Sequence, residues 1–249
     1  MSTIFITGCS TGFGLETARL FLDRGWNVIA TMRNTDLSVL PHSDRLRILQ
    51  LDVTDPVSVA RAVDEAGAID VLVNNAGFGF PSPVELTDRD IARALFETNT
   101  LGTLAMIQAV LPAFRQRRAG VIVNVSSATT LKPLPLVGLY RSSKAAVNAL
   151  TESLAEEVRP FGIRVHLVLP GRAPETQFGS KAIPLLRGSD SPDYAPMIKR
   201  ILAHIHDSTG PTTQPSDVTD AIWQIATDPA SPFLIAAGAD AQGWLAQAT

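Results

Sequence analysis

The chain lacks the features that mark secreted, membrane-spanning or nucleic-acid-binding proteins. Its single cysteine, Cys9, excludes an internal disulfide. No apolar run reaches the roughly 18 residues that a membrane-spanning helix needs. The net charge of -3 gives no basic excess for binding nucleic acid. Because the first apolar segment follows almost directly after the initiator Met, we expect no signal peptide. These absences predict a cytoplasmic protein with neither a nucleic-acid nor a membrane partner.

Repeats and low-complexity tracts are also absent, and what remains is a regular alternation of short apolar runs with helical stretches. This pattern is typical of a parallel sheet with both faces covered. With 249 residues, of which 45% are hydrophobic, the chain can bury one full core, so we expect a single domain over residues 1–249. We therefore predict an α/β fold, a doubly wound parallel sheet in three α/β/α layers. The seven expected strands are Ile4–Ile6, Val28–Ala30, Ile48–Leu51, Val71–Val73, Val121–Val125, Val165–Leu169 and Phe233–Ile235.

Tyr140 and Lys144 are four residues apart in a stretch, 138–160, whose apolar spacing predicts a helix. Residues at this spacing share one face of a helix. A phenol has a pKa near 10, so acid or base chemistry near neutral pH requires lowering it by roughly 3 units, and an ammonium group one turn away would supply part of that. Ser127 follows a predicted strand, at the carboxyl end where open parallel sheets bind ligands. A serine donor facing a tyrosine proton source suits a carbonyl oxygen, although Tyr and Lys at this spacing also occur by chance.

A glycine-rich turn connects the first predicted strand to an amphipathic helix that ends before Gly25. Glycine permits positive φ and close backbone approach, so amide groups and the positive end of the helix can face a pyrophosphate. The spacing G-x-x-x-G-x-G differs from the G-x-G-x-x-G fingerprint, and the strand-turn-helix context carries the prediction. The predicted dinucleotide-binding residues of this turn are Gly8, Ser10, Thr11, Gly12, Phe13 and Gly14.

Seven motifs, in order and spacing, resemble those of the single-domain short-chain dehydrogenase/reductase family, over Thr3 to about Ala241. The resemblance implies a Rossmann-type fold. The matching motifs are Thr7–Gly14, Leu51–Val53, Asn74–Gly77, Asn99–Gly102, Ser127, Tyr140 with Lys144, and Pro170–Gly171.

The same resemblance implies a role for each catalytic residue. Ser127 would hold and polarise the substrate oxygen, and Tyr140 would give a proton to it during reduction or remove one during oxidation. Lys144 would bind the nicotinamide ribose and lower the pKa of Tyr140, while Asn99 would hold a water that links Lys144 to solvent. Hydride transfer itself belongs to the cofactor. The further cofactor contacts implied are Asp52, Val53, Asn74, Ala76, Gly77, Tyr140, Lys144, Pro170 and Gly171. We expect Asn75 and Asn124 to tie strands and loops together instead.

The end of the second predicted strand indicates which dinucleotide is bound. A carboxylate there would bind the ribose 2′-hydroxyl of NAD, but Thr31 occupies that position. Arg33 could pair with the 2′-phosphate of NADP, and a charge-assisted hydrogen bond of about 1.5–3 kcal/mol corresponds to a roughly ten- to hundredfold preference. Against this, Thr11 stands where some NADP-dependent relatives carry a second basic residue. NADP(H) is the predicted cofactor, and NAD is less favoured.

Residues 172–215 form a proline- and glycine-rich insertion, and such long insertions are usually functional in compact domains. The family resemblance implies that it is a substrate lid. Two departures from the family pattern lie at its start: Glu175 stands where a threonine is usual and Thr176 follows it, and Arg172 could reach a substrate acid or a cofactor phosphate. The apolar residues that could line a pocket, about half of which would only pack the lid onto the body, are Phe178, Ile183, Leu185, Leu186, Tyr194, Met197, Leu134, Leu136 and Phe78.

The resulting prediction is an NADP(H)-dependent carbonyl reductase that acts on a bulky, mostly apolar ketone or secondary alcohol. The closing residues 237–241 support this, since they resemble those of relatives near the 17β-hydroxysteroid and retinol dehydrogenases. Two alternatives stay open: an NAD-dependent alcohol or hydroxysteroid dehydrogenase, and a non-catalytic dinucleotide-binding redox sensor, which the Tyr-Lys pair disfavours. An epimerase or dehydratase usually has a longer C-terminal domain.

Two further expectations concern assembly and metals. The resemblance implies a homodimer or homotetramer, formed through the helices around 90–117 and 140–160. His204 and His206 look like a metal-binding pair, but on the predicted helix they point about 200° apart. We therefore expect no metal site.

Overall fold

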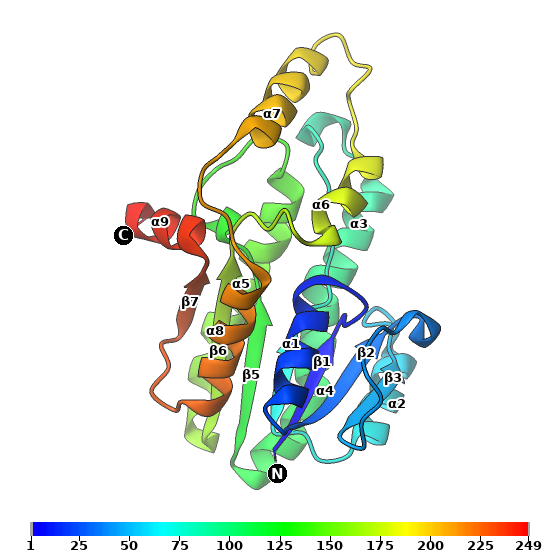
Figure 1. The fold of residues 1–249 in the computed structure, drawn as a ribbon, viewed down its shortest axis with the longest axis vertical. Helices are drawn as coiled ribbons and strands as arrows, with labels where there is room; N and C mark the ends of the chain where they lie inside the picture. The colour runs from blue at the N-terminus through cyan, green and yellow to red at the C-terminus, as the bar shows by residue number, and fades with distance from the viewer. Residues whose placement is uncertain (1, 249) are drawn as a thin grey trace.

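The computed structural model describes residues 2–248, except for the side chains of Leu37 and His206, and its centre is a parallel seven-stranded sheet (Figure 1). The strand order is β3-β2-β1-β4-β5-β6-β7, so the chain changes direction across the sheet between β1 and β4. Open α/β sheets bind their ligands at such a switch point. The predicted α/β class and doubly wound sheet are confirmed. The strands are β1 Thr3–Thr7, β2 Asn27–Met32, β3 Leu46–Gln50, β4 Val71–Asn74, β5 Gly120–Val125, β6 Ile163–Pro170 and β7 Leu234–Ala237.

Helices cover both faces of this sheet, which gives the predicted three layers. The two faces have separate cores: Ile4 and Ile6 of β1 lie in one and Phe5, between them, lies in the other, because successive strand side chains point to opposite faces. Figure 1 shows the helices of the first face, α1 and α8, on the side toward the viewer. The covering helices are α1 Gly12–Asp23 and α8 Pro215–Thr227 on one face, and α2 Pro56–Ala66, α4 Gly102–Arg117 and α5 Gly138–Val158 on the other.

The remaining helices lie around the carboxyl ends of the strands. Helix α3 (Arg89–Phe96) runs through a π-helical segment, Glu97–Leu101, into α4. Residues 172–215 are more regular than their composition indicates, since they form α6 (Gln177–Ala182) and α7 (Ala195–Asp207). Figure 1 shows α7 at the opposite end of the molecule from the N-terminus, with α6 between α7 and the start of α1. Helix α9 (Ala239–Ala248) follows β7. Within residues 2–248, none of the helices combines the length and the apolar character needed to span a membrane.

Helix α5, which carries Tyr140 and Lys144, begins at Gly138 as expected but ends at Val158, two residues before the predicted end. Pro160 lies inside a 3₁₀ turn, Arg159–Phe161, that follows the helix. Proline has no N–H to donate and clashes with the preceding turn of an α-helix, so it ends the regular helix here.

The two ends of segment 172–215 are fixed together beside β6 by the buried side chains of Thr213 and Asp240. The N–H of Gly171 donates to Thr213 Oγ1 at 2.8 Å, and the Oγ1 also lies 2.7 Å from Asp240 Oδ1. The N–H of Arg172 donates to Asp240 Oδ2 at 2.6 Å, and that of Thr213 donates to the Arg172 carbonyl at 2.8 Å. The segment therefore leaves and re-enters the fold at a single point.

Replacing Gly14 with alanine should destabilise the protein, because its Cβ would lie 2.4 Å from the Gly8 carbonyl oxygen and 2.5 Å from Asn75 Nδ2. Overpacking of this kind costs about 1–3 kcal/mol. The matched control is Gly243→Ala in α9, where nothing lies within 4 Å and the better helix former should stabilise by up to about 1 kcal/mol. Urea denaturation measures both changes. A Gly14→Ala variant as stable as the wild type would contradict this packing.

Candidate active site

A cleft of about 2220 Å³ opens along the carboxyl ends of β1, β4, β5 and β6. Usual small-molecule pockets measure about 300–1,000 Å³, so this cleft has room for a dinucleotide together with a substrate. Most of the predicted site residues lie on its wall: Gly8, Ser10, Thr11, Gly12, Phe13, Arg33, Asp52, Val53, Ala76, Gly77, Ser127, Tyr140, Lys144, Pro170 and Gly171. Three predicted residues, Gly14, Asn74 and Asn99, are not part of this wall.

Ser127 follows β5 and begins a 3₁₀ turn, Ala128–Thr130. Its Oγ accepts hydrogen bonds from the backbone N–H of Thr129 at 3.2 Å and from Thr129 Oγ1 at 3.0 Å. Because Thr129 provides both of these donors, the Ser127 hydroxyl can direct its own proton toward Tyr140, and a hydrogen bond joins the two side chains. Thr129, which the structure shows bonded twice to the Ser127 hydroxyl, was missed in the sequence analysis. The sequence could have indicated this contact, because serine hydroxyls commonly accept a hydrogen bond from the backbone N–H two residues further along the chain.

The expected lowering of the Tyr140 pKa is not found, and this corrects the sequence analysis. Removal of the phenol from water raises the pKa of Tyr140 to about 12, and the hydrogen bond with Ser127 offsets only part of that rise. One reason for the desolvation is Phe178, whose ring centroid lies 5.5 Å from that of Tyr140. At neutral pH the phenol is therefore protonated, the form that gives a proton to a carbonyl oxygen.

Lys144 lines the cleft although it is largely buried, and its Nζ donates to the Val125 carbonyl at 2.8 Å. Burial lowers the pKa of Lys144 to about 8, since the charged form loses hydration that a single carbonyl does not replace. The ammonium is thus poised to lose its proton much more readily than an exposed lysine.

Asn99 lies in the π-helical segment and is fully buried. Its Oδ1 accepts from the Phe78 N–H at 3.0 Å, and its Nδ2 donates to the Phe78 carbonyl at 2.9 Å and to Ser143 Oγ at 3.0 Å. Short π-helical segments inside α-helices are frequent at functional sites. Asn99 therefore joins the loop after β4 to α5 one residue before Lys144.

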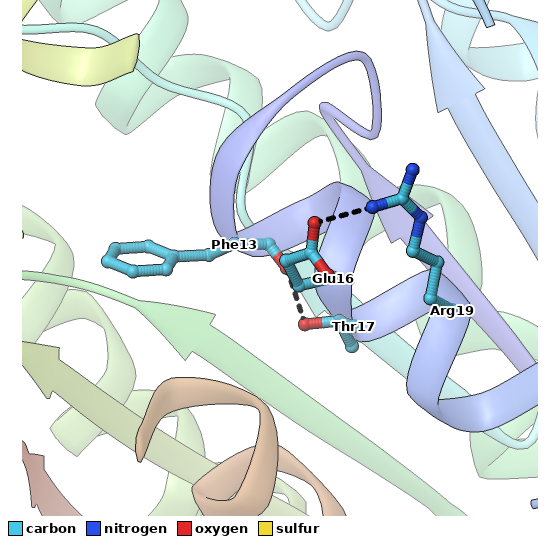
Figure 2. Close-up of polar contacts among 4 residues, drawn as sticks. All are labelled: Phe13, Glu16, Thr17 and Arg19. Atoms are coloured by element: carbon cyan, nitrogen blue, oxygen red, sulfur yellow. Dashed lines mark hydrogen bonds and ion pairs between the residues drawn. The ribbon is translucent and has the colours of Figure 1, made fainter. Parts of the chain in front are cut away.

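The glycine turn fits the pyrophosphate of a dinucleotide. Gly12 adopts a left-handed φ of 61°, which a side chain would strain. It begins α1, whose first turn has neither a side-chain cap from Thr11 nor an acidic residue, so the amide groups there remain for an anion. Figure 2 shows the other polar contacts of this helix: Glu16 pairs with Arg19 at 2.9 Å, and Thr17 Oγ1 donates to the Phe13 carbonyl.

At the far end of the cleft, Arg33 is exposed on the wall beside Asp52. The N–H of Thr54 holds the pKa of Asp52 below its usual value, with smaller contributions from the Thr54 hydroxyl and from the charge of Arg33. Because Asp52 Oδ1 accepts both Thr54 bonds, at 3.0 and 2.7 Å, this carboxylate is turned toward its own loop. Arg33 has no carboxylate ion pair among residues 2–248.

Asn74 departs from its predicted role. Its Nδ2 donates to Asn124 Oδ1 at 2.9 Å, and Asn124 in turn donates to Thr151 of α5 at 2.9 Å. The Asn74 side chain therefore joins β4 to β5, because it ends a strand whose neighbour carries an asparagine in register, and Asn124 extends the connection to α5. Asn75 also ties loops together, as expected, by donating to the carbonyls of Thr7 and Gly8.

The start of segment 172–215 shows which of Glu175 and Thr176 faces the cleft and what Arg172 binds. Thr176, not Glu175, lies on the cleft wall, and it caps α6 by accepting from the Phe178 N–H. Arg172 also lines the cleft. Its guanidinium donates to the carbonyls of Ile205 and Ser208 at the end of α7, so it caps that helix and is not free to bind a substrate acid. Of the expected apolar residues, those on the wall are Phe78, Leu134, Leu136, Phe178, Ile183, Leu185 and Met197.

Two residues expected to line the pocket lie outside its wall, and neither Cys9 nor the histidines form a reactive or metal-binding site among the described residues. Leu186 and Tyr194 are not part of the wall, and the Tyr194 hydroxyl donates to Glu85 instead. Burial raises the pKa of Cys9 to about 12, so it remains a thiol, in agreement with a packing role. Among the described residues, no cluster of three His, Cys, Asp or Glu side chains could hold a metal; the side chain of His206 lies outside that description.

The model of the short chain dehydrogenase family matches residues 2–183. A 3-ketodihydrosphingosine reductase from Bacteroides thetaiotaomicron is 36% identical over 234 residues, covering 92% of this chain and 85% of that protein. The chain therefore belongs to the short-chain dehydrogenase/reductase family and is an oxidoreductase of that family.

Solved structures of the family share the fold over nearly the whole chain. A short-chain dehydrogenase from Streptomyces avermitilis superposes with a TM-score of 0.88 at 31% identity, covering 99% of this chain and 92% of that one. A short chain dehydrogenase from Burkholderia cenocepacia, crystallised in complex with NADP, gives a TM-score of 0.79 at 29% identity, covering 99% and 91%.

The buried Lys144 should make the protein more stable as the pH rises from about 8 to about 10. Its pKa is about 8 in the folded chain and 10.5 as a model value, so in this window the unfolded chain binds a proton that the folded chain does not. Unfolding then takes up a proton, and raising the pH disfavours it, by at most about 3 kcal/mol. Tyr140, with its raised pKa, acts in the opposite direction only above pH 10.

Urea denaturation at about pH 8 and about pH 10, on wild type and Lys144→Met, measures this effect. Other titrating groups are common to both proteins, so the difference between the two isolates Lys144. A wild type that gains no more stability than the variant would contradict the burial of a titrating lysine.

Proposed function

We propose that this protein is an NADP(H)-dependent carbonyl reductase for bulky, mostly apolar ketones, which also oxidises the corresponding secondary alcohols. The observation that carries the proposal is the meeting of Ser127, a protonated Tyr140 and Lys144 on the wall of one cleft large enough for both ligands. The reductase name and 36% identity of the Bacteroides relative support the reaction, and the NADP complex of the Burkholderia protein supports the cofactor.

In this proposal the bound cofactor supplies the hydride. The Ser127 hydroxyl, oriented by Thr129, donates to the carbonyl oxygen and polarises it. Tyr140 gives its proton to the same oxygen as negative charge develops there. With a pKa of about 12 the phenol is protonated at neutral pH, which is the form that reduction requires.

Lys144 then has two tasks in the proposed mechanism. Its ammonium binds the ribose hydroxyls of the cofactor and, with a pKa of about 8, it can return a proton toward Tyr140. Asn99 fixes the helix that carries Lys144 through Ser143. The sequence-based assignment of a water on Asn99, linking Lys144 to solvent, forms part of the proposal.

The proposed substrate class rests on the apolar residues that line the cleft around Tyr140. Phe178 covers Tyr140, and apolar side chains from the 134–136 loop and from α7 continue that wall. Leu136 holds a left-handed φ of 66° there, although it is buried and not glycine. Non-glycine residues in this region cost about 1–3 kcal/mol and cluster at ligand sites. We therefore assign segment 172–215 as the lid over an apolar ketone.

Substitution of Tyr140 by phenylalanine should abolish NADPH oxidation while leaving NADPH binding intact. Removing a general acid typically costs about 100- to 10,000-fold in rate. Oxidation of NADPH at 340 nm is followed with aromatic, steroidal and long-chain ketones and 1,2-dicarbonyls, for wild type and variant. Turnover that survives the substitution would overturn the role of Tyr140, and tight binding without turnover of any substrate in either direction would favour a redox sensor.

Arg33 should determine the preference for NADPH over NADH. In Arg33→Ala, the KM for NADPH should rise roughly tenfold or more, whereas the KM for NADH should stay unchanged, because only NADPH has the 2′-phosphate. Arg45→Ala, which removes another exposed arginine away from the cleft wall, is the matched control. A wild type that prefers NADH would leave the reductase intact and reject the Arg33 assignment.

A further inference from the structure

Lys181 of α6 connects the lid to the glycine turn through a polar contact. Its Nζ donates to Thr11 Oγ1 at 3.2 Å, although the two residues are 170 positions apart. Thr176 approaches the same turn, since a methyl group on Gly12 would lie 3.7 Å from its Cβ. Thr11, Gly12, Thr176 and Lys181 all line the cleft. Helix α6 therefore rests directly above the place where α1 begins.

The charges at this contact do not balance. A threonine hydroxyl does not neutralise an ammonium group, and Lys181 has no carboxylate partner among the described residues. The beginning of α1 carries partial positive charge, with no acidic residue in the first turn. Glu16, the nearest acid along the helix, pairs with Arg19 on the outer surface (Figure 2). Two positive groups thus face each other, an arrangement that an anion between them would stabilise.

We propose that Lys181 binds the pyrophosphate of the dinucleotide, so that the cofactor itself holds the lid helix α6 down on the glycine turn. This inference rests on the proposed function, which puts a dinucleotide in the cleft. The anion would lie between the α1 amide groups and the Lys181 ammonium, and would replace the weak contact with Thr11. Lid closure then depends on bound cofactor before any ketone enters.

The pyrophosphate is common to NADPH and NADH, and this gives a specific test. In Lys181→Met, the Kd of both dinucleotides, measured by fluorescence titration at low salt, should rise by the same factor, roughly two- to fivefold for an exposed charge. Lys199→Met, which removes an exposed lysine of α7 outside the cleft wall, should leave both Kd values unchanged. Thermal melting of each variant checks that the fold is intact.

The outcomes separate this inference from the proposed function. If wild type binds neither dinucleotide, both are overturned. If wild type binds and Lys181→Met binds as tightly as Lys199→Met, only the Lys181 assignment fails. Weakened binding of NADPH alone would move Lys181 to the 2′-phosphate and overturn the pyrophosphate assignment.

Hydrogen exchange tests the coupling to the lid. NADPH at saturating concentration should slow amide exchange in residues 173–186 of wild type and of Lys199→Met, and should slow it clearly less in Lys181→Met. Equal protection in all three proteins would show that the cofactor does not hold α6 through Lys181.

Discussion

The side chain of Asn99 holds together the two parts of the chain that carry the proposed chemistry. It bonds both backbone groups of Phe78, in the loop after β4, and the Ser143 hydroxyl next to Lys144 in α5. The site lies at the carboxyl ends of separate strands, so each group arrives on a different loop and must be fixed by contacts across them. The amide itself is fully buried, and the bond to Ser143 lies entirely in the interior, where an unsatisfied partner would cost about 1–3 kcal/mol. Together with the bonds of Thr100 and Ser126 to the carbonyls of Ser143 and Lys144, this amide fixes the part of α5 that carries Lys144 and, one turn earlier, Tyr140.

A second constraint connects the catalytic floor to its cover. Thr213 and Asp240 hold both ends of segment 172–215 beside Gly171. Within this segment, Arg172 caps the end of α7, the ring of Phe178 packs against Tyr140, and Lys181 contacts Thr11 at the start of α1. The lid thus contacts the reacting end of the cleft through an apolar ring and the phosphate end through a charge. Each contact suits the chemistry proposed for that part of the cleft.

The fold and most of the candidate site residues could be predicted from the sequence, because the strands are continuous apolar runs and the motifs directly follow them. The glycine turn and the Tyr140–Lys144 pair are local patterns, and local spacing fixes them on one turn or one helix face. Other features depend on contacts between distant segments. Asn74 faces Asn124 because two strands are in register, Arg172 caps a helix more than twenty residues away, and burial raises the Tyr140 pKa although the nearby lysine was expected to lower it. Lys181 carries no motif, and only the folded lid brings it to Thr11.

The central claim is that a protonated Tyr140 and an oriented Ser127 activate a ketone for direct hydride transfer in this cleft. The most direct measurement uses NADPH with deuterium at the transferred position of the nicotinamide, an apolar ketone, and mass analysis of the alcohol product. The account predicts an alcohol with deuterium on the carbinol carbon, formed by wild type and absent with Tyr140→Phe. An alcohol without deuterium, or dinucleotide that binds and is never oxidised by any ketone, would contradict it.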